Sequence, residues 1–453
     1  MKQQPRVAVI GGGLAGLATA AALGSAGYET QLFESKPFLG GRATSYAPPA
    51  GEDSGHIDNC QHILLRCCVN LLDFYERLHV AKDITFYREF FFMEPGGRTS
   101  IMKAGILPTP LHFAGSFRKL QFISLKDKIG IGKAMLAVKS ERRTRKDLDQ
   151  ITMLDWLKEK NQTPNAIERF WRQILVSAIN EELDTMAAAH GFQVIWLGFL
   201  AKSNSYEMGV PNVPLGELYG SGAWKSMEHV QLHPRAPIEG FTVRDGRLAS
   251  VTSGGVEHEA DYFVSALPFE KLRPLLASAD VNLPIEWDAF THSPITGIHL
   301  WFDRSITDRP HATLLDRTIQ WMYNKPWDGH AADGRYVQLV VSASRRLTNM
   351  ARADVIELAR KELAEFFPKV LEANLVKAHV VKEIRATFSA VPGLEAKRPV
   401  SKTGIANLFL AGDWTRSGWP ATMEGAVRSG YLAAEAVTRA AGDPKTFLVP
   451  DIA

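Results

Sequence analysis

The chain is organised around the stretch Val7-Ala8-Val9-Ile10-Gly11-Gly12-Gly13-Leu14-Ala15-Gly16, with Leu32-Phe33-Glu34 following further on. An apolar, β-branched run leads directly into a Gly-x-Gly-x-x-Gly motif, and residues 17–23 are rich in Ala and Leu. This order predicts a strand, a tight turn, a helix opened by the third glycine, and a second strand ending in an acid. A lone glycine motif also occurs as plain structure, but the four features together favour a dinucleotide-binding fold.

Each residue of this unit has an expected task. Gly11 permits the tight turn, Gly13 lets the backbone approach a pyrophosphate, and Gly16 allows the helix to pack closely on the strand. The diphosphate is expected at the positive N-terminus of the helix, and the Glu34 carboxylate can accept hydrogen bonds from a ribose hydroxyl. The cofactor contacts predicted here are Gly11, Gly13, Leu14, Ala15, Gly16, Glu34 and Ser35.

A second glycine pair bears on the choice between NAD and FAD. Residues 39–44 read Leu-Gly-Gly-Arg-Ala-Thr, which could bring backbone and a guanidinium to the other side of a diphosphate. A Gly-Gly-Arg placed after the acid resembles the pattern of flavoproteins of the amine oxidase and phytoene desaturase type. The resemblance implies FAD, with contacts from Gly41, Arg42 and Ala43.

The C-terminal part carries another signature. Residues 407–415 read Asn-Leu-Phe-Leu-Ala-Gly-Asp-Trp-Thr, a strand ending in Ala-Gly-Asp, and a helix is expected to begin near Met423. Asp413, next to Gly412, can bind ribityl or diphosphate-linked hydroxyls. The helix N-terminus can direct N–H groups at the flavin oxygen that becomes electron-rich on reduction. Signatures at opposite ends of one chain are more specific than either alone.

The patterns between these ends predict two insertions. A helical stretch over 148–200 and a loop over 209–224 precede strands at 230–232, 236–241, 248–253, 256–258 and 260–267, and then a helix near Pro268. Further strands at 296–302, 320–323 and 336–342 and a helix over 353–367 follow. We therefore predict an α/β fold: a Rossmann-type FAD-binding domain in three segments, 1–85, 216–285 and 391–453, and an α+β substrate domain, 86–215 (mainly helical) and 286–390 (sheet and helix). In related flavoproteins the first of these strand pairs reaches the adenine, which implies a main-chain contact near Ala236.

Bulk properties limit the alternatives. The 453 residues suffice for two or three domains, and the hydrophobic and charged fractions, 45% and 22%, are those of an ordinary soluble protein. No apolar run is long enough to span a membrane, and the N-terminus lacks the pattern of an export signal. The three cysteines are clustered and no Cys/His set has metal-ligand spacing, so we expect neither a disulfide framework nor a metal. A cytoplasmic location fits.

The segment Asp58-Asn59-Cys60-Gln61-His62 resembles the stretch that lies beside the isoalloxazine ring in such flavoproteins, although glycine is more usual than Cys60. Gln61 and His62 are therefore expected to face the flavin. The alternative is that His62 is a buried structural histidine and Asp58 a turn or cap residue. The aromatic stretch at 86–92 likewise allows two interpretations, a hairpin that fills a core or the wall of an apolar substrate tunnel.

Residues 117–147 are strongly basic and interleaved with apolar side chains. The acidic residues of this stretch are only three, Asp127, Glu141 and Asp147, in a chain of net charge +3. The basic residues are ten: Arg118, Lys119, Lys126, Lys128, Lys133, Lys139, Arg142, Arg143, Arg145 and Lys146. No nucleic-acid motif accompanies them, so nucleic acid is not the expected partner. A solvated helix face and contact with anionic lipid at the inner face of the cytoplasmic membrane both fit.

The closer resemblance lies in three motifs, residues 58–62, 412–415 and 419–426. With both Rossmann parts, they resemble the squalene-associated FAD-dependent desaturases. That resemblance implies hydroxysqualene reduction to squalene by enzyme-bound reduced FAD, as in hopanoid biosynthesis, with an apolar triterpenoid substrate and a separate electron donor. It leaves the oligomeric state open.

The chemistry needs an acid for the leaving oxygen and an apolar cavity that protects an allylic cation. We predict His62, positioned by Asp58, as the acid, and Trp419, Gln61 and Thr422 as residues of the substrate pocket. Because each methylene exposed to water costs about 0.8 kcal/mol, the substrate is expected to arrive from lipid.

Three alternatives stay open. Amine oxidases share the Met-Glu-Gly-Ala ending but usually carry an aromatic residue before the Met, where this chain has Thr422. No cysteine in the C-terminal half could tether the flavin, so FAD is expected to be non-covalent. An oxidative desaturase of a carotenoid or other polyene would use the same fold and an equally apolar tunnel. A flavin-binding protein without enzymatic activity is the third.

Overall fold

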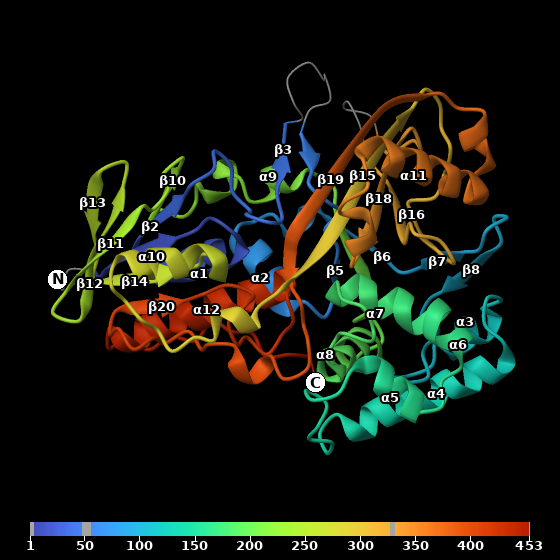
Figure 1. Cartoon of the computed structure of the whole chain (residues 1–453), viewed down its shortest axis with the longest axis horizontal. Helices are drawn as coiled ribbons and strands as arrows, with labels where there is room; N and C mark the ends of the chain where they lie inside the picture. Colours follow the sequence, from blue (N-terminus) through green and yellow to red (C-terminus); the bar gives the residue numbers. More distant parts are fainter. Residues whose placement is uncertain (1–3, 48–55, 327–330, 453) are drawn as a thin grey trace.

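The computed structural model describes residues 4–47, 56–326 and 331–452. Figure 1 shows a nucleotide-binding part on the left, a mainly antiparallel sheet with one long helix at the upper right, and a group of helices at the lower right. The predicted fold class, an α/β dinucleotide fold joined to an α+β part, is confirmed.

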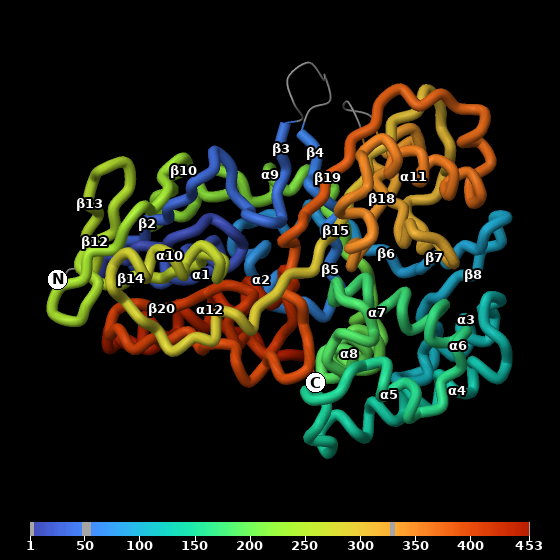
Figure 2. Tube along the Cα trace, viewed as in Figure 1, coloured from blue at the N-terminus to red at the C-terminus, as the bar shows by residue number. Residues whose placement is uncertain are grey.

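A five-stranded parallel sheet forms the centre of the nucleotide-binding part, in the order β10-β2-β1-β14-β20. Its strands are β1 (Arg6–Ile10), β2 (Glu29–Glu34), β10 (Val230–Pro234), β14 (Tyr262–Ser265) and β20 (Leu408–Leu410). Three stretches far apart in the sequence therefore pair side by side, as the blue, yellow-green and red parts of Figure 2 show. Strands β1, β2, β14 and β20 are mostly buried because helices cover the sheet, whereas the edge strand β10 has no buried residue.

Two helices from opposite ends of the chain pack against each other on this sheet, α1 (Leu14–Ser25) and α12 (Met423–Ala440). Gly430 permits the close approach, since a Cβ there would lie 2.3 Å from the Ala15 carbonyl oxygen. The remaining helices of this part are α2 (Val69–Arg77), α9 (Leu215–Leu218) and α10 (Phe269–Ser278). The helices expected near Pro268 and Met423 are thus confirmed.

An antiparallel sheet of three strands, β11 (Gly240–Arg244), β12 (Arg247–Ser253) and β13 (Val256–Glu259), extends the nucleotide-binding part. The predicted strand over 236–241 is wrong at its start. The Arg235 and Ala236 N–H groups donate to the Lys36 and Glu34 carbonyls, so this backbone follows the end of β2 instead of pairing with β12.

The predicted loop over 209–224 is also wrong in part, because it contains β9 (Met208–Pro211), α9 and the 3-10 turn η4 (Ser221–Trp224). Its prolines mark element boundaries: Pro211 ends β9, and Pro214 precedes α9. Strand β9 lies between β5 (Leu64–Leu65) and β6 (Ile84–Tyr87), while β3 (Ser45–Tyr46) pairs with β4 (Ile57–Asp58).

The second part contains a seven-stranded sheet in the order β19-β15-β18-β17-β16-β7-β8. Its strands are β7 (Phe90–Met93), β8 (Thr99–Met102), β15 (His292–Phe302), β16 (His311–Leu314), β17 (Trp321–Asn324), β18 (Tyr336–Ser342) and β19 (Leu375–Phe388), and α11 (Arg352–Phe366) packs against it. The aromatic stretch forms a hairpin only from Phe90 onward, and this hairpin joins the sheet through a parallel pairing of β7 with β16. Phe86 and Tyr87 belong to β6, which pairs with β9 in another sheet. Sequence patterns did not single out β16 or β19.

The helical part holds α3 (Ala114–Lys119), α4 (Leu125–Glu141), α5 (Met153–Glu159), a helix from Pro164 to Ile179 formed by α6, η2 and α7, and a helix from Ala188 to Leu200 formed by α8 and η3. The expectation of helices over 148–200 is confirmed. Side chains cap several starts: Ser124 begins α4 with a capping box, and Thr163 precedes Pro164 at the first helical position. Within the described residues no helix is long and apolar enough to cross a bilayer.

Candidate active site

The first glycine motif adopts a conformation that only glycine fits. Gly11 has φ of +108°, and a Cβ at Gly16 would lie 1.9 Å from the Gly11 carbonyl oxygen. Larger side chains would therefore push α1 away from the turn that follows β1. The helix begins earlier than predicted: its first residues are Leu14 and Ala15, before Gly16, so their N–H groups lie at its positive N-terminus.

The second glycine pair closes over the first. Gly40 forms a bridge with Gly13, and a Cβ on Gly41 would lie 2.9 Å from the Gly13 Cα. A Cβ on Gly13, in contrast, would have no atom nearer than 3.9 Å. The two backbones thus pack directly on each other, and the lack of side chains leaves the backbone beside Gly13 open to the close approach of a diphosphate.

The Glu34 carboxylate is buried at the end of β2 and accepts hydrogen bonds from three neighbours. Gly12 N–H donates to Oε2 at 2.7 Å, while Lys36 N–H and Ser35 Oγ donate to Oε1 at 2.8 and 3.0 Å. The Ala236 N–H donates to the Glu34 carbonyl at 2.8 Å. The structure therefore brings together three of the predicted cofactor contacts, Glu34, Ser35 and Ala236.

Arg42 and Asp413 form an ion pair that joins the first and third segments of the nucleotide-binding part. Arg42 Nη1 also donates to the Ala386 carbonyl at 3.1 Å, and the carbonyl of Ala43 accepts a hydrogen bond from the Tyr219 hydroxyl. Gly412 has φ of +130° and donates its N–H to Ser429 Oγ at 2.8 Å. All the predicted cofactor residues around the second glycine pair and the Ala-Gly-Asp motif thus meet at one place.

Sequence reasoning missed Arg398, which holds the Ala-Gly-Asp loop in place. Its side chain is fully buried, and Nη2 donates to the carbonyl of Asp413 at 2.8 Å and to that of Thr415. Nη1 pairs with Glu395 at 2.5 Å. In the sequence, Arg398 precedes a proline and, further on, a predicted strand. Nothing in this local pattern indicates that its side chain holds the Ala-Gly-Asp loop.

Helix α12 begins where the flavin is expected. Thr422 is the N-cap, its Oγ1 accepts from Gly425 N–H at 3.0 Å, and Met423 is the first helical residue. The N–H groups of the first turn have no partner within the helix, so they offer donors to an electron-rich ring edge.

Asp58 does not orient His62, contrary to the prediction. His62 Nε2 lies 3.0 Å from Asn59 Oδ1, whereas the Asp58 carboxylate accepts from Ser45 Oγ at 2.6 Å and pairs with Lys325 at 3.2 Å. Although burial acts to raise it, the Lys325 charge and these hydrogen bonds hold the pKa of Asp58 below its ordinary value. The extended β4 turns Asp58 toward Ser45 on the paired strand β3, so the carboxylate cannot also reach the imidazole.

Burial lowers the pKa of His62 to about 4, against the opposing charge of Asp58. The imidazole is therefore neutral at pH 7. Gln61 is buried beside it, and its Oε1 accepts from Lys325 Nζ at 2.9 Å. Gln61 does not line the apolar cavity that lies at the start of α12, so the structure does not support its predicted role in the substrate pocket.

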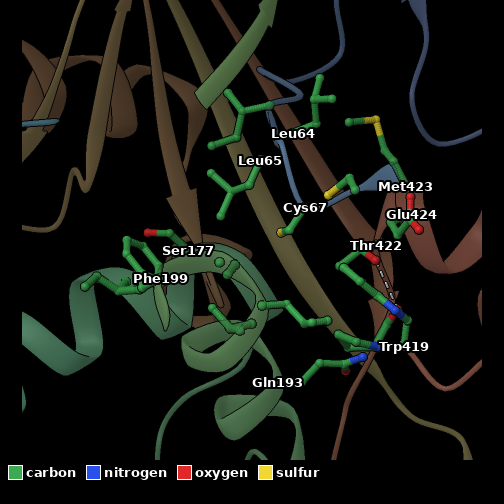
Figure 3. A pocket seen from close by; sticks show the side chains of 18 of the residues that line it. Leu64, Leu65, Cys67, Ser177, Gln193, Phe199, Trp419, Thr422, Met423 and Glu424 are labelled. Atoms are coloured by element: carbon green, nitrogen blue, oxygen red, sulfur yellow. Dashed lines mark hydrogen bonds between the residues drawn. The ribbon is translucent and has the colours of Figure 1, made fainter. Parts of the chain in front are cut away.

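An apolar cavity lies against the start of α12. Its volume is about 170 Å³, counted as the space open to the centre of a water-sized sphere. Figure 3 shows Thr422, Met423, Glu424 and Trp419 on one side and Phe199 with Ser177 on the other. The wall consists of Ile63, Leu64, Leu65, Cys67, Cys68, Leu71, Phe90, Phe92, Met102, Gln173, Ile174, Ser177, Ala178, Gln193, Val194, Leu197, Gly198, Phe199, Trp321, Trp419, Pro420, Thr422, Met423 and Glu424.

This lining settles several predictions about position. Trp419 and Thr422 do border the cavity, and Phe90 and Phe92 of the aromatic hairpin are both buried in the core and part of the cavity wall. The Trp419 indole N–H donates to Asp451 at 3.2 Å, and the same carboxylate accepts from Arg428 at 2.9 Å. Asp451 therefore fixes the indole through the C-terminal residues, which no motif indicated.

Glu424 is a further residue that sequence reasoning did not select. It is 1% exposed, and its carboxylate accepts from Leu71 N–H at 2.7 Å and from the Asn70 side-chain amide at 2.8 Å. It thus caps α2 from another helix, because the N-cap of α2, Cys68, makes no side-chain cap bond. Burial raises the pKa of Glu424 to about 7 although these hydrogen bonds act against the shift.

The sequence matches the family described as flavin containing amine oxidoreductase over residues 14–438. The chain belongs to this family. Among curated proteins it is similar to the 15-cis-phytoene desaturase of Synechococcus elongatus, with 27% identity and 95% of each chain covered. It is also similar to the zeta-carotene desaturase of Synechocystis sp., with 24% identity over 95% of this chain and 97% of that one.

Solved structures share the fold of this chain. An oxidoreductase from Methanosarcina mazei matches with a TM-score of 0.70 and 17% identity, covering 94% of this chain and 98% of that one. Cyclohexylamine oxidase from Brevibacterium oxydans matches with a TM-score of 0.65 and 16% identity, covering 96% and 99%. These identities support the fold alone.

The chain is an FAD-dependent oxidoreductase of this family. The residues present fit the cofactor: the backbone beside Gly13 is open, the buried Glu34 carboxylate lies at the end of β2, and Met423 at the N-terminus of α12 lines the apolar cavity. Gly11, Gly13, Gly41 and Asp413 would hold the diphosphate region, and Met423 would hold the flavin ring.

Proposed function

We propose that this oxidoreductase acts on a long apolar isoprenoid and that its reaction is the reductive dehydroxylation of hydroxysqualene to squalene. The observation that carries the substrate class is the cavity at the start of α12, whose wall is mostly aliphatic and aromatic. Bound reduced FAD supplies the hydride for this reaction. The choice of hydroxysqualene rests on the motifs shared with the squalene-associated desaturases.

The cavity wall suits a reaction through an allylic cation. Aliphatic groups such as Leu64, Leu65 and Leu197 keep water away from the carbon that loses its hydroxyl, and aromatic faces attract positive charge. The substrate cation is quenched when hydride adds, so exclusion of water decides whether hydrocarbon or alcohol forms. Trp419 and Trp321 supply aromatic faces in this wall.

Polar groups in the wall support a substrate that carries a hydroxyl. Gln173 lines the cavity and is 4% exposed; its Nε2 donates to the Glu168 carbonyl at 3.4 Å, and its Oε1 has no partner among the described residues. A buried acceptor without a partner costs about 1–3 kcal/mol. A substrate O–H reaching this oxygen would recover that energy, whereas a pure hydrocarbon would not.

The leaving oxygen needs a proton, and two residues are the proposed sources. His62 is the one predicted from the sequence, but it is neutral at pH 7 and outside the cavity wall. Glu424 lines the cavity, and its raised pKa, about 7, keeps part of the carboxyl protonated near neutral pH. We favour Glu424, because an acid must reach the reacting oxygen and carry a proton at the working pH.

The deciding experiment begins with anaerobic reduction of the purified FAD-loaded protein by dithionite. Hydroxysqualene is then added, and flavin absorbance and squalene are followed together, the latter by mass spectrometry. Squalene formed in step with flavin reoxidation supports the dehydroxylase. Reoxidation without squalene, or no reoxidation, contradicts it.

Oxidative desaturation of a polyene is the second proposal, and the similarity to phytoene and zeta-carotene desaturases favours it. The same apolar cavity would hold a carotenoid precursor. The oxidised protein is mixed anaerobically with phytoene, and bleaching of the flavin with gain of a double bond in the product would assign the desaturase.

A further inference from the structure

The outward face of α4 presents apolar side chains to solvent. Leu125, Ile129 and Leu136 are 73%, 53% and 58% exposed, although the opposite face of the same helix is buried through Ile131 and Val138. Their spacing of four and seven residues places them on one stripe along the helix. A solvated helix face is normally polar, so this stripe is a surface suited to an apolar phase.

The basic and acidic side chains of α4 lie on different sides of the helix. Lys126, Lys133 and Lys139 are exposed beside the apolar stripe. The two acids of the helix are engaged inward instead: Asp127 is 3% exposed and accepts from Asn165 at 2.7 Å, and Glu141 accepts from the Trp156 indole at 2.9 Å. The outward face is therefore apolar and cationic without nearby compensating carboxylates from its own helix.

A second exposed apolar group lies in the loop between β8 and α3. Ile106, Leu107 and Leu111 are 103%, 47% and 57% exposed. The loop is tied to α3, since Ser116 Oγ donates to the Lys103 carbonyl at 2.6 Å, and α4 is tied to α3, since Lys128 Nζ donates to the Arg118 carbonyl at 2.9 Å. β8, α3 and α4 accordingly lie at the right of Figure 1, with the two helices below the strand.

This surface is continuous with the wall of the cavity. Phe113, at the end of the loop, lies 6.1 Å from Phe199 between ring centroids, and Phe199 lines the cavity. The inner side of α4 packs on η3 (Val194–Leu200), which also contributes to the wall. An apolar molecule leaving a bilayer at this loop would meet apolar side chains as far as the cavity.

We propose that the loop 104–111 and the outward face of α4 dock on a bilayer containing anionic lipid and that the substrate passes from the bilayer to the cavity beside Phe113. The charge of the exposed lysines complements anionic headgroups, while the leucines and isoleucines enter the boundary of the acyl chains. The proposed docking depends only on the exposed apolar and cationic side chains, whereas the proposed passage of substrate rests on the proposed function. Compared with the basic stretch selected from the sequence, the surface adds the loop and excludes the inward face of α4.

The FAD-loaded protein is co-sedimented with vesicles of phosphatidylcholine and phosphatidylglycerol and with vesicles of phosphatidylcholine alone. The lysine variant combines three substitutions of exposed cations, Lys126→Gln, Lys133→Gln and Lys139→Gln. The stripe variant combines three substitutions in the apolar stripe, Leu125→Gln, Ile129→Gln and Leu136→Gln. Two matched controls, Leu371→Gln and Lys361→Gln, change exposed residues near the far end of α11.

The wild type and both controls should bind the anionic vesicles, and the lysine variant should bind on the order of 100-fold more weakly, as expected for three surface cations. The stripe variant should lose binding while its circular dichroism and FAD content stay unchanged. Equal binding of all five proteins, absence of wild-type binding, or formation of a dimer that the stripe variant abolishes would overturn the proposal.

The two proposals fail separately. Vesicle binding is measured without substrate, and turnover of hydroxysqualene is measured in detergent, where no docking is needed. If the wild type converts hydroxysqualene in detergent but does not bind vesicles, the docking surface is refuted and the proposed reaction stands. If it binds vesicles but does not convert hydroxysqualene, the proposed reaction is refuted and the docking surface stands.

Discussion

Replacing Glu424 by Gln should change how the stability of the fold depends on pH. The Glu424 carboxyl is 1% exposed, and burial raises its pKa from 4.5 to about 7. An acid with a raised folded pKa binds more protons in the folded than in the unfolded chain between those two values. The free energy of unfolding should therefore fall as the pH rises through this window.

The size of the effect follows from the shift. At roughly 1.4 kcal/mol per pKa unit, the rise to about 7 corresponds to about 3 kcal/mol. Glutamine has no ionisable group, so Glu424→Gln should lack this contribution, and the difference between the two proteins isolates it from other titrating groups. Glu424→Ala should instead be less stable at every pH, because the Leu71 N–H and the Asn70 amide lose their acceptor.

The assay is urea unfolding of the FAD-loaded protein at several pH values from about 5 to about 8, followed by far-UV circular dichroism. Glu357→Gln is the matched control, because the Glu357 side chain is 73% exposed on α11. The reasoning is refuted if Glu424→Gln keeps the pH slope of the wild type, or if the exposed control loses it.

Three further changes test the cofactor cradle, the acid and the cavity wall. Gly16→Ala places a Cβ 1.9 Å from the Gly11 carbonyl oxygen and should yield protein without FAD, whereas Gly222→Ala, with no atom within 4 Å of the added Cβ, should keep its flavin absorbance. Because the pKa of His62 is lowered to about 4, its titration should leave no inflection near pH 6.5 in the turnover profile; His62→Ala with normal turnover and bound FAD would exclude it as the acid. Asp451→Ala removes the acceptor of the Trp419 indole and should raise KM more than it lowers kcat, while an unchanged KM would show that the indole does not depend on this contact.

The cofactor motifs could be predicted because they are local. A glycine at φ of +108°, a helix beginning directly after the motif's second glycine and an acid at the end of the next strand are all encoded within one short stretch. Strand and helix patterns also indicated the three pieces of the parallel sheet. The patterns failed at 236–239, where no strand forms and the backbone N–H of Ala236 bonds to the end of β2.

The candidate active site was only partly predictable, because its decisive contacts join residues far apart in the sequence. The Arg42–Asp413 pair spans 371 positions, and the contact of Glu424 with Asn70 spans 354. Nothing local distinguishes Glu424 from a surface glutamate of an N-terminal helix turn. Its burial, and with it the raised pKa, exists only once α2 packs on α12.

The sequence by itself determined that the chain has a dinucleotide-binding fold, because turn geometry and helix starts depend on residues close along the chain. The tertiary structure decided which polar groups meet and which apolar ones stay exposed. Asp58 faces Lys325 instead of His62, and the lysines of α4 face solvent while Asp127 faces inward. Such choices follow from packing between elements, where burial sets both the charge state of a group and the surface left for a partner.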